Sequence, residues 1–314
     1  MILIPDMLDA ATILRGVIPL YLILLLGFAA RRGKVLGSEV EHALASLTIR
    51  VLIPCLILDK ILGSEALRQT GTVIWAVTLG ALGIVAGILI SLAWGKLTRM
   101  QKGSGLRTFA LATGVQNYGF TAIPVVAAIA PGSAVMGVLF VHNLGVEITM
   151  WSFGLLILSG SATGIGKALV NGPVIAVLSG MLLVKSGFDT HIPAAMRSAF
   201  HLLGETAVPL SMFMVGMTMA DLIFSQRPGL KVVASAVILR LGVLAMILLA
   251  AAKFLPIAPE LKTVLVVQAA MPSAVFPIVL ARHYGGSPAV AVQITVFTGL
   301  AALFLPELPA MRLE

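Results

Sequence analysis

The sequence predicts an all-α integral membrane protein whose ten transmembrane helices form two inverted five-helix repeats. The first observation is composition: 59% of the 314 residues are apolar and 11% are charged, against roughly 45–50% and about 25% in soluble domains. The second is spacing, because the charged residues divide the chain into apolar stretches long enough to cross a bilayer. The third is a set of prolines that recurs in both halves.

The charge-free stretches define the individual spans, each close to the roughly 20 residues that a transmembrane helix needs. The uncharged stretch between Arg107 and Glu147 contains Pro131-Gly132-Ser133 and is therefore predicted to form two helices joined by a turn. The expected spans are 11–31, 40–61, 72–95, 107–130, 134–159, 168–186, 200–221, 231–253, 262–282 and 287–307. The short loops between them exclude a large extramembranous catalytic or nucleic-acid-binding domain.

Basic residues predict the orientation in the membrane. They cluster in residues 31–34 and 96–107, two loops that an alternating topology places on one side. By the positive-inside tendency this side is cytoplasmic, so we expect a multi-pass protein of the cell (inner or plasma) membrane with both termini outside the cytoplasm. The net charge of +8 first indicates contact with lipid headgroups, and attraction of anionic substrates is the second interpretation.

The proline pattern indicates an internal duplication. Equivalent prolines lie at nearly constant offsets of 154, 155 and 153 residues, namely Pro19 with Pro173, Pro54 with Pro209, and Pro124 with Pro277. Because five spans are an odd number, the second copy enters the membrane from the opposite side, as in many transporters. We therefore predict one five-helix repeat over residues 1–160 and a second over residues 161–314.

Two segments, 116–126 and 267–279, are broken by proline or glycine within the fourth span of each repeat. A proline removes a backbone donor and displaces the carbonyl four residues earlier, so Pro124 frees backbone near Phe120 and Pro277 frees it near Ser273. Freed backbone must be buried in protein or line a watery cavity, and a matched pair of broken segments is the best sequence pointer to a transporter's binding site.

Polar side chains in these breaks suit ligand binding, because amides can hold a carboxylate or a cation without a fixed charge. The predicted substrate-binding residues are Gln116, Asn117, Tyr118, Pro124, Gln268, Ser273 and Pro277. The alternative interpretation is that these polar groups only hold helices together.

The fifth span contains an ionisable residue, Glu147, below the expected midplane. Such a group is costly unless it is paired, hydrated or protonated, so it is a functional candidate. Asn143 lies one turn earlier on the same face. We predict that Asn143 and Glu147, with Asn117, bind a coupling cation, or that Glu147 binds a proton in each cycle. His142 is a further candidate, and for all three side chains a structural hydrogen bond or ion pair is the alternative.

Three other polar positions carry narrower predictions. Arg50 and Glu205 each precede a repeat proline by four residues, so we expect them to pair across the repeat; Arg50 as an anion-attracting group in the path is the alternative. Arg240 is expected to extend along its aliphatic stem toward the cytoplasm, and no role is assigned to it. The single cysteine, Cys55, lies inside a span, so no disulfide or cysteine metal cluster is available. We expect no cofactor and no bound metal.

Short motifs around the breaks resemble a known family. They are Asn117-Tyr118-Gly119 followed by Pro124, His142-Asn143 with Glu147, and Met271-Pro272-Ser273-Ala274. These motifs resemble the prokaryotic branch of the auxin efflux carrier family, which includes proposed malonate and malate carriers and is related to plant PIN proteins. The resemblance covers nearly the whole chain in length, span count and duplication.

The resemblance implies that helices 4 and 9 cross at the substrate site, as in bile acid–sodium symporters. It also implies a scaffold of helices 1, 2, 6 and 7, a transport bundle of helices 3–5 and 8–10, an elevator-like movement, and a homodimer formed through the scaffold. Carried onto this chain, it adds Gly119 and Pro272 to the substrate site. Plant members have asparagine–proline pairs at both crossings, whereas here Asn117 precedes Tyr118 and Met271 precedes Pro272, which argues against indole-acetate.

These features predict a secondary carrier for a small organic anion such as malonate or malate. Coupling to a proton or a sodium ion and uniport driven by the membrane potential both stay open, as does the direction of transport. A channel or a non-transporting membrane sensor is the alternative. We expect no enzymatic activity, because neither His-Glu-x-x-His nor Gly-x-Ser-x-Gly occurs. The expected partners are the anion, the coupling ion and the lipid bilayer, and not nucleic acid.

Overall fold

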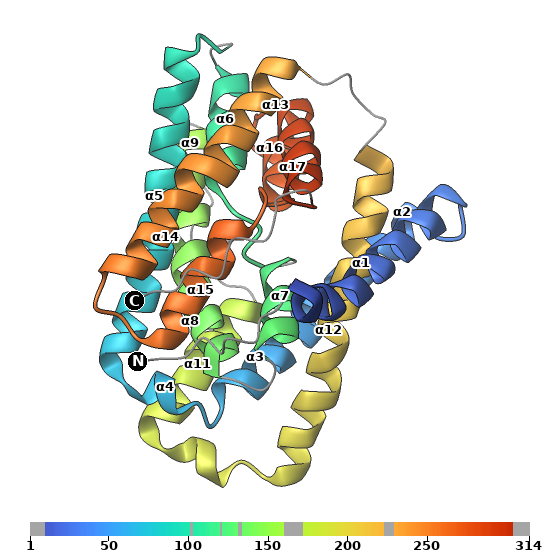
Figure 1. Cartoon of the computed structure of the whole chain (residues 1–314). Helices are drawn as coiled ribbons and strands as arrows, with labels where there is room; N and C mark the ends of the chain where they lie inside the picture. Colours follow the sequence, from blue (N-terminus) through green and yellow to red (C-terminus); the bar gives the residue numbers. More distant parts are fainter. Residues whose placement is uncertain are drawn as a thin grey trace.

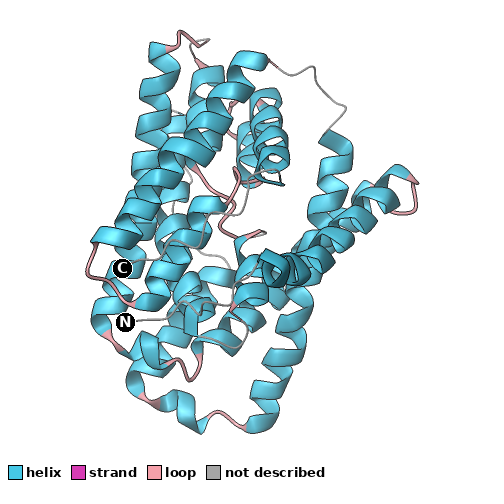
Figure 2. Cartoon of the chain, in the orientation of Figure 1, coloured by secondary structure: helices cyan, strands magenta, loops and turns pink. Residues whose placement is uncertain are grey.

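The chain is helical throughout the parts that the computed structural model describes, which are residues 10–100, 103–119, 121–130, 134–159, 172–222 and 229–303 (Figure 2). No strand occurs within those ranges, and an isolated antiparallel bridge joins Gln116 to Ser273. The all-α class predicted from composition is therefore confirmed.

Apart from the short α4, the helices of the first half fall on the first five expected spans. In chain order they are α1 (Ala10–Arg32), α2 (Ser38–Leu47), the π-helical segment η1 (Thr48–Leu52), α3 (Ile53–Ile61), α4 (Glu65–Arg68), α5 (Thr70–Leu97), α6 (Ser104–Gly114), α7 (Ala122–Ile129), α8 (Ala134–Thr149), the π-helical segment η2 (Met150–Gly154) and α9 (Leu155–Ser159). The series α2–η1–α3 and α8–η2–α9 run without a gap, so each series fills one expected span.

Apart from the short turn η3, the elements of the second half fall on the remaining five expected spans. Its elements are α11 (Gly172–Ser186), the 3₁₀ turn η3 (Phe188–His191), α12 (Ala194–Leu222), α13 (Leu230–Val237), the π-helical segment η4 (Ile238–Val243), α14 (Leu244–Phe254), α15 (Pro259–Ala270), α16 (Phe276–His283) and α17 (Pro288–Leu303). The start of the sixth expected span and the end of the tenth lie outside the described residues.

Four helices in the described ranges are long and apolar enough to cross a membrane: Thr70–Leu97, Ala134–Ser159, Ala194–Asp221 and Leu230–Phe254. Two more, Gly172–Ser186 and Pro288–Ala302, are apolar but shorter. The protein is therefore a multi-pass membrane protein. The count of ten spans and the inverted relation of the two halves stay predictions.

The helices pack as two groups (Figure 1). In the first group, α1 packs along α12, and α3 packs against α11 and α12. In the second group, α5 packs against α6 and α8, α14 against α15, and α13 against α17. The two groups meet where α8 contacts α3 and where α7 contacts α1 and α12. In the expected numbering the first group contains helices 1, 2, 6 and 7, the set that the resemblance assigns to a scaffold.

Glycines let α1 and α12 approach closely within the first group. A methyl group added to Gly27 would overlap the carbonyl oxygen of Phe213, and one added to Gly216 would overlap the carbonyl oxygen of Leu24. Small residues at helix contacts are typical of membrane proteins, in which close backbone packing takes over from the hydrophobic effect. The backbones of α1 and α12 are therefore in direct contact at these glycines.

We expect Gly216→Ala to destabilise the protein by about 1–3 kcal/mol, because the added methyl group fits only if α1 and α12 separate. Gly71→Ala is the matched control, since nothing lies within 4 Å of a methyl group added at Gly71. Thermal unfolding of the purified variants in detergent measures both effects. An unchanged midpoint for Gly216→Ala would contradict the close α1–α12 packing.

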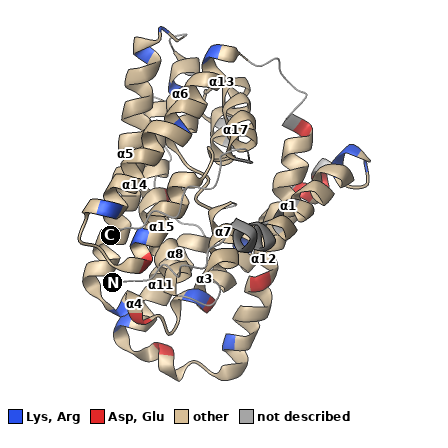
Figure 3. Cartoon of the chain, in the orientation of Figure 1, with Lys and Arg blue, Asp and Glu red and all other residues tan. Residues whose placement is uncertain are grey.

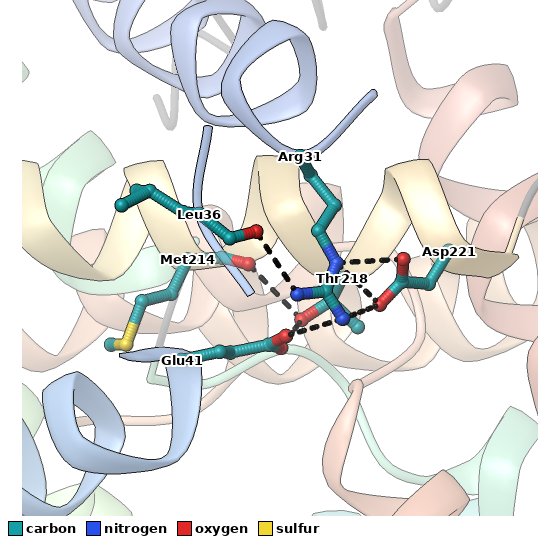
Figure 4. Close-up of polar contacts among 6 residues, drawn as sticks. All are labelled: Arg31, Leu36, Glu41, Met214, Thr218 and Asp221. Atoms are coloured by element: carbon teal, nitrogen blue, oxygen red, sulfur yellow. Dashed lines mark hydrogen bonds and ion pairs between the residues drawn. The ribbon is translucent and has the colours of Figure 1, made fainter. Parts of the chain in front are cut away.

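A polar cluster joins one end of α1, α2 and α12 (Figure 4). Arg31 donates from Nε and Nη2 to the Asp221 carboxylate at 2.8 and 2.6 Å, and its Nη2 lies 3.6 Å from Glu41. The Thr218 hydroxyl donates to Glu41 at 2.9 Å. The two-point contact between a guanidinium and a carboxylate fixes orientation, so this cluster sets how the three helix ends lie relative to one another.

Charged residues lie mainly near helix ends and in connections (Figure 3). The α1–α2 and α5–α6 connections, whose basic residues predict the orientation, both lie in the upper half of the view (Figures 1 and 3). Which side of the membrane they face stays a prediction.

Candidate functional site

The two broken segments cross and bond to each other through their backbones. The Asn117 amide donates to the Pro272 carbonyl at 2.7 Å, and the Ala274 amide donates to the Val115 carbonyl at 2.9 Å. Backbone groups inside a membrane protein must find partners within the protein. Each break therefore satisfies part of the backbone that the other break exposes, and the structure brings together the two segments singled out in the sequence.

Each break is followed by a half-helix that has a proline in its first turn. Pro124 lies in the first turn of α7 and Pro277 in the first turn of α16. A proline is well tolerated there, because its missing N–H would have no partner within the helix. The chain is unwound just before these turns, between α6 and α7 and between α15 and α16. Phe120, near which we expected freed backbone, lies outside the described residues.

Two threonines of α17 fix the second break. The Ser273 amide donates to the Thr298 hydroxyl at 3.1 Å, and the Thr295 hydroxyl donates to the Ala274 carbonyl at 2.8 Å. Neither threonine was predicted to belong to the site. Their signal was a spacing of three residues, which places both hydroxyls on one face of a largely apolar helix.

The Glu147 carboxylate is the centre of a hydrogen-bonded cluster beside the first break. Its Oε1 accepts from the Tyr118 hydroxyl at 2.7 Å, and its Oε2 accepts from the Trp151 indole N–H at 2.9 Å. The Asn143 amide donates to the Tyr118 carbonyl at 2.9 Å. Within the described residues no basic side chain pairs with this carboxylate. Neutral donors alone therefore hold it.

The cluster continues to the second break. Gln268 Nε2 donates to Asn143 Oδ1 at 3.2 Å, and His142 Nδ1 lies 3.4 Å from the same oxygen. Asn143 therefore bonds to both broken segments, since its Nδ2 donates to Tyr118 and its Oδ1 accepts from Gln268. This residue links the crossing to Glu147.

A cavity of about 300 Å³ lies between the crossing and the first group of helices. The second group contributes Asn117, Tyr118, Gly119, Ile123, Pro124, Phe140, Asn143, Leu144, Glu147, Trp151, Ala274, Val275 and Phe276 to its lining. The first group contributes Ile49, Ile53, Leu56, Ile57, Pro173, Val174, Val177, Ala207, Val208 and Ser211. Among the described lining residues, one wall thus carries amides, a phenol, an indole and a carboxylate, whereas the other is apolar apart from the Ser211 hydroxyl.

Asn117 and Gly119 are the lining residues best placed to meet a ligand. The Asn117 side chain is 5% exposed and forms no hydrogen bond with the described residues, so its amide is free toward the cavity. A methyl group added to Gly119 would meet nothing within 4 Å, so the backbone there faces open space. An unpaired amide beside bare backbone can hold a carboxylate group.

Several predicted site residues lie behind this cavity instead of lining it. Gln116, Gln268, Ser273 and His142 are 2%, 0%, 1% and 1% exposed. Pro272 takes part through its carbonyl oxygen, and Pro277 is buried in α16. These residues lie behind the cavity wall. The predicted site residues that line the cavity are Asn117, Tyr118, Gly119, Pro124, Asn143 and Glu147.

Arg50 and Glu205 do not meet, so the predicted pair is wrong. Glu205 Oε1 lies 3.6 Å from His201 Nε2, and Arg50 is exposed and has no ion-pair partner among the described residues. Arg50 lies in η1. A π-helical turn holds one residue more than an α-helical turn, so side chains beyond it rotate away from the face that a simple offset predicts.

Arg240 does not reach a membrane surface, which corrects a second expectation. Its side chain is 1% exposed, and its Nη2 lies 3.5 Å from the Gln268 carbonyl oxygen. Arg240 lies in η4, another π-helical segment. Trp151 was missed altogether, although it lies four residues after Glu147 on the same helix and its indole N–H needs an acceptor when buried.

A multi-pass helical protein with two interrupted helices that cross beside a cavity belongs to the class of membrane transporters. The family described as membrane transport protein matches residues 12–168 and 163–310. The chain therefore belongs to this family, which is the auxin efflux carrier family that its motifs resemble. It is a transporter family and not an enzyme family.

A curated relative comes from the archaeon Methanothermobacter thermautotrophicus. That protein is described as an uncharacterized transporter and is 28% identical over 209 residues, which are 65% of this chain and 67% of the relative. The family and the relative agree on transport as the general function.

Proposed function

We propose that this protein is a secondary carrier that moves a small organic anion, a malonate- or malate-like carboxylate, across the cell membrane. The observation that carries the proposal is the two-sided cavity. Its polar groups come from the crossing, α8 and η2, and the described residues of the facing wall, from η1, α3, α11 and α12, are almost entirely apolar. A wall without polar groups makes few specific bonds with a carboxylate. Substrate bound to the crossing can therefore slide along that wall.

This asymmetry supports an elevator mechanism with alternating access. The first group of helices acts as the scaffold, and the second group carries the substrate as a rigid bundle. In this proposal the repeats over residues 1–160 and 161–314 are inverted copies, whose exchange of conformations gives the outward-open and inward-open states. The scaffold also forms the contact of a homodimer.

Coupling is proposed to occur at Glu147 and Asn143. The carboxylate lines the cavity, and the described residues hold it only through neutral donors, Tyr118 and Trp151. A carboxylate beside an anion site repels the substrate unless a cation or a proton accompanies it. Glu147 is therefore proposed to take up a proton or a sodium ion together with the anion, and His142 to support Asn143 from behind.

The movement is testable with paired cysteines in a Cys55→Ala background. Ile53 and Ile123 lie on opposite walls of the cavity. Oxidation of the Ile53→Cys/Ile123→Cys pair is expected to change in rate by about threefold or more when malonate is added, because the bundle slides past α3.

The matched control is Ile61→Cys/Gly180→Cys, which joins two helices of the scaffold. A methyl group on Gly180 would lie 3.4 Å from the Ile61 Cβ, close to the separation that a disulfide needs. Its rate should not respond to malonate. Equal responses of the two pairs would count against a sliding bundle.

A further inference from the structure

Arg240 is the largest fully buried side chain among the described residues. None of the acidic side chains described pairs with it, its Nε atom has no hydrogen-bond partner, and its Nη2 contact with the Gln268 carbonyl oxygen is long, at 3.5 Å. A buried guanidinium is stable only with a counter-charge or a full set of acceptors. The described residues supply neither: they give this positive charge the long contact with the Gln268 carbonyl and no counter-charge.

The backbone places this charge at the end of a half-helix. η4 interrupts the eighth span with a π-helical turn, a feature frequent at functional sites. Gln268 lies in the last turn of α15, where carbonyl oxygens point toward the crossing and carry partial negative charge. The guanidinium therefore lies at the C-terminal end of the half-helix that leads into the second break.

The first half of the chain has no such charge at the corresponding place. Gly114 ends α6 and lies 154 residues before Gln268, and Gly87 lies 153 residues before Arg240. A methyl group on Gly87 would overlap the Gly114 carbonyl oxygen, and α5 runs through this position without a π-helical segment. The C-terminal end of α6 thus packs against a glycine of α5, whereas the C-terminal end of α15 contacts a cation. Such a difference between similar halves is not required by packing alone.

A short chain of hydrogen bonds connects Arg240 to the cavity wall. Gln268, whose carbonyl Arg240 contacts, donates from its side chain to Asn143 at 3.2 Å, and Asn143 lines the cavity. Glu147 lines the same wall with the opposite charge. We infer that Arg240 is the charge-selecting residue of the carrier. It is a fixed cation behind the polar wall of the cavity, and it offsets the negative charge of Glu147 while that carboxyl group is ionised. The substrate carboxylate then supplies the counter-charge that Arg240 lacks within the protein. This inference rests on the proposed function.

Binding measurements with ligands of different charge test this role. The probes are malonate, lactate and uncharged malonamide, titrated against Trp151 fluorescence in a Trp75→Phe/Trp94→Phe background. Arg240→Met is expected to weaken lactate binding about tenfold and malonate binding about a hundredfold, because one unit charge acts at about 10 Å through an effective dielectric constant near 20. Malonamide binding should not change, and Arg240→Lys should retain binding of both anions.

The double variant Glu147→Gln/Arg240→Met separates electrostatics from damage to the fold, because it removes both buried charges. In sodium-free buffer at high pH, where Glu147 is ionised and carries no coupling ion, anion affinity should return to within about threefold of wild type, as expected for two coupled charges. Equal losses for the dianion, the monoanion and malonamide, or no recovery in the double variant, would overturn the inference while the carrier function stands. If wild type binds neither malonate nor lactate, the proposed function fails, and this role of Arg240 fails with it.

Discussion

Glu147→Gln is expected to abolish accumulation of malonate against its gradient while leaving exchange of malonate across the membrane intact. A tenfold ion gradient stores about 1.4 kcal/mol, so one-to-one coupling supports about tenfold accumulation. Glutamine keeps the size of the side chain but cannot be ionised. The variant should therefore equilibrate malonate and not concentrate it. Proteoliposome uptake with pH and sodium gradients imposed separately gives the result and identifies the ion.

Trp151→Phe is the matched control for Glu147→Gln. It removes the indole donor to Glu147 Oε2 but keeps the carboxylate and its bond from Tyr118. Accumulation should persist, with a changed dependence on the coupling ion. If Glu147→Gln accumulates malonate as well as wild type does, coupling lies elsewhere or transport is uniport.

Asn117→Ala is expected to weaken malonate binding by roughly 10–100-fold, because a hydrogen bond to a charged group contributes about 1.5–3 kcal/mol. The Asn117 amide is free toward the cavity, and its backbone N–H is already bonded to Pro272. The substitution therefore removes a ligand contact and leaves the crossing intact. Equilibrium binding and the concentration dependence of uptake both measure the loss.

Ser211→Ala is the matched control for Asn117→Ala. Among the described residues, Ser211 supplies the single hydroxyl on the scaffold wall of the cavity. This wall is proposed to make no specific bond with the carboxylate. Its affinity for malonate should stay within about threefold of wild type, as is common for a peripheral polar contact. A larger effect for Ser211→Ala than for Asn117→Ala would reverse the assignment of the two walls.

The meeting of the breaks was the part of the site most accessible from sequence. Proline spacing and the apolar context placed both interruptions, and an interrupted segment in a membrane must be buried against protein. Asn143 and Glu147 followed because polar groups are rare and costly in such an environment. The structure brings these residues to one cavity with Asn117 and Tyr118.

Other features left little trace in the sequence. The π-helical segments at Arg50 and Arg240 shift side chains away from the 3.6-residue period on which face predictions depend. The apolar wall, with residues such as Ile53 and Val174, is indistinguishable in sequence from any lipid-facing or packed helix surface. Apolar side chains signal function only once the fold shows what they face.

In this proposal the crossed breaks form the substrate site of a carboxylate carrier. A flux screen tests it most directly: uptake of radiolabelled malonate, malate, lactate and acetate into proteoliposomes containing wild type or Asn117→Ala, with protein-free liposomes as the baseline. The predicted result is saturable flux of at least one carboxylate in wild type that falls at least about tenfold in Asn117→Ala at concentrations below saturation. No flux above the protein-free baseline, or equal flux in the two proteins, would contradict the claim.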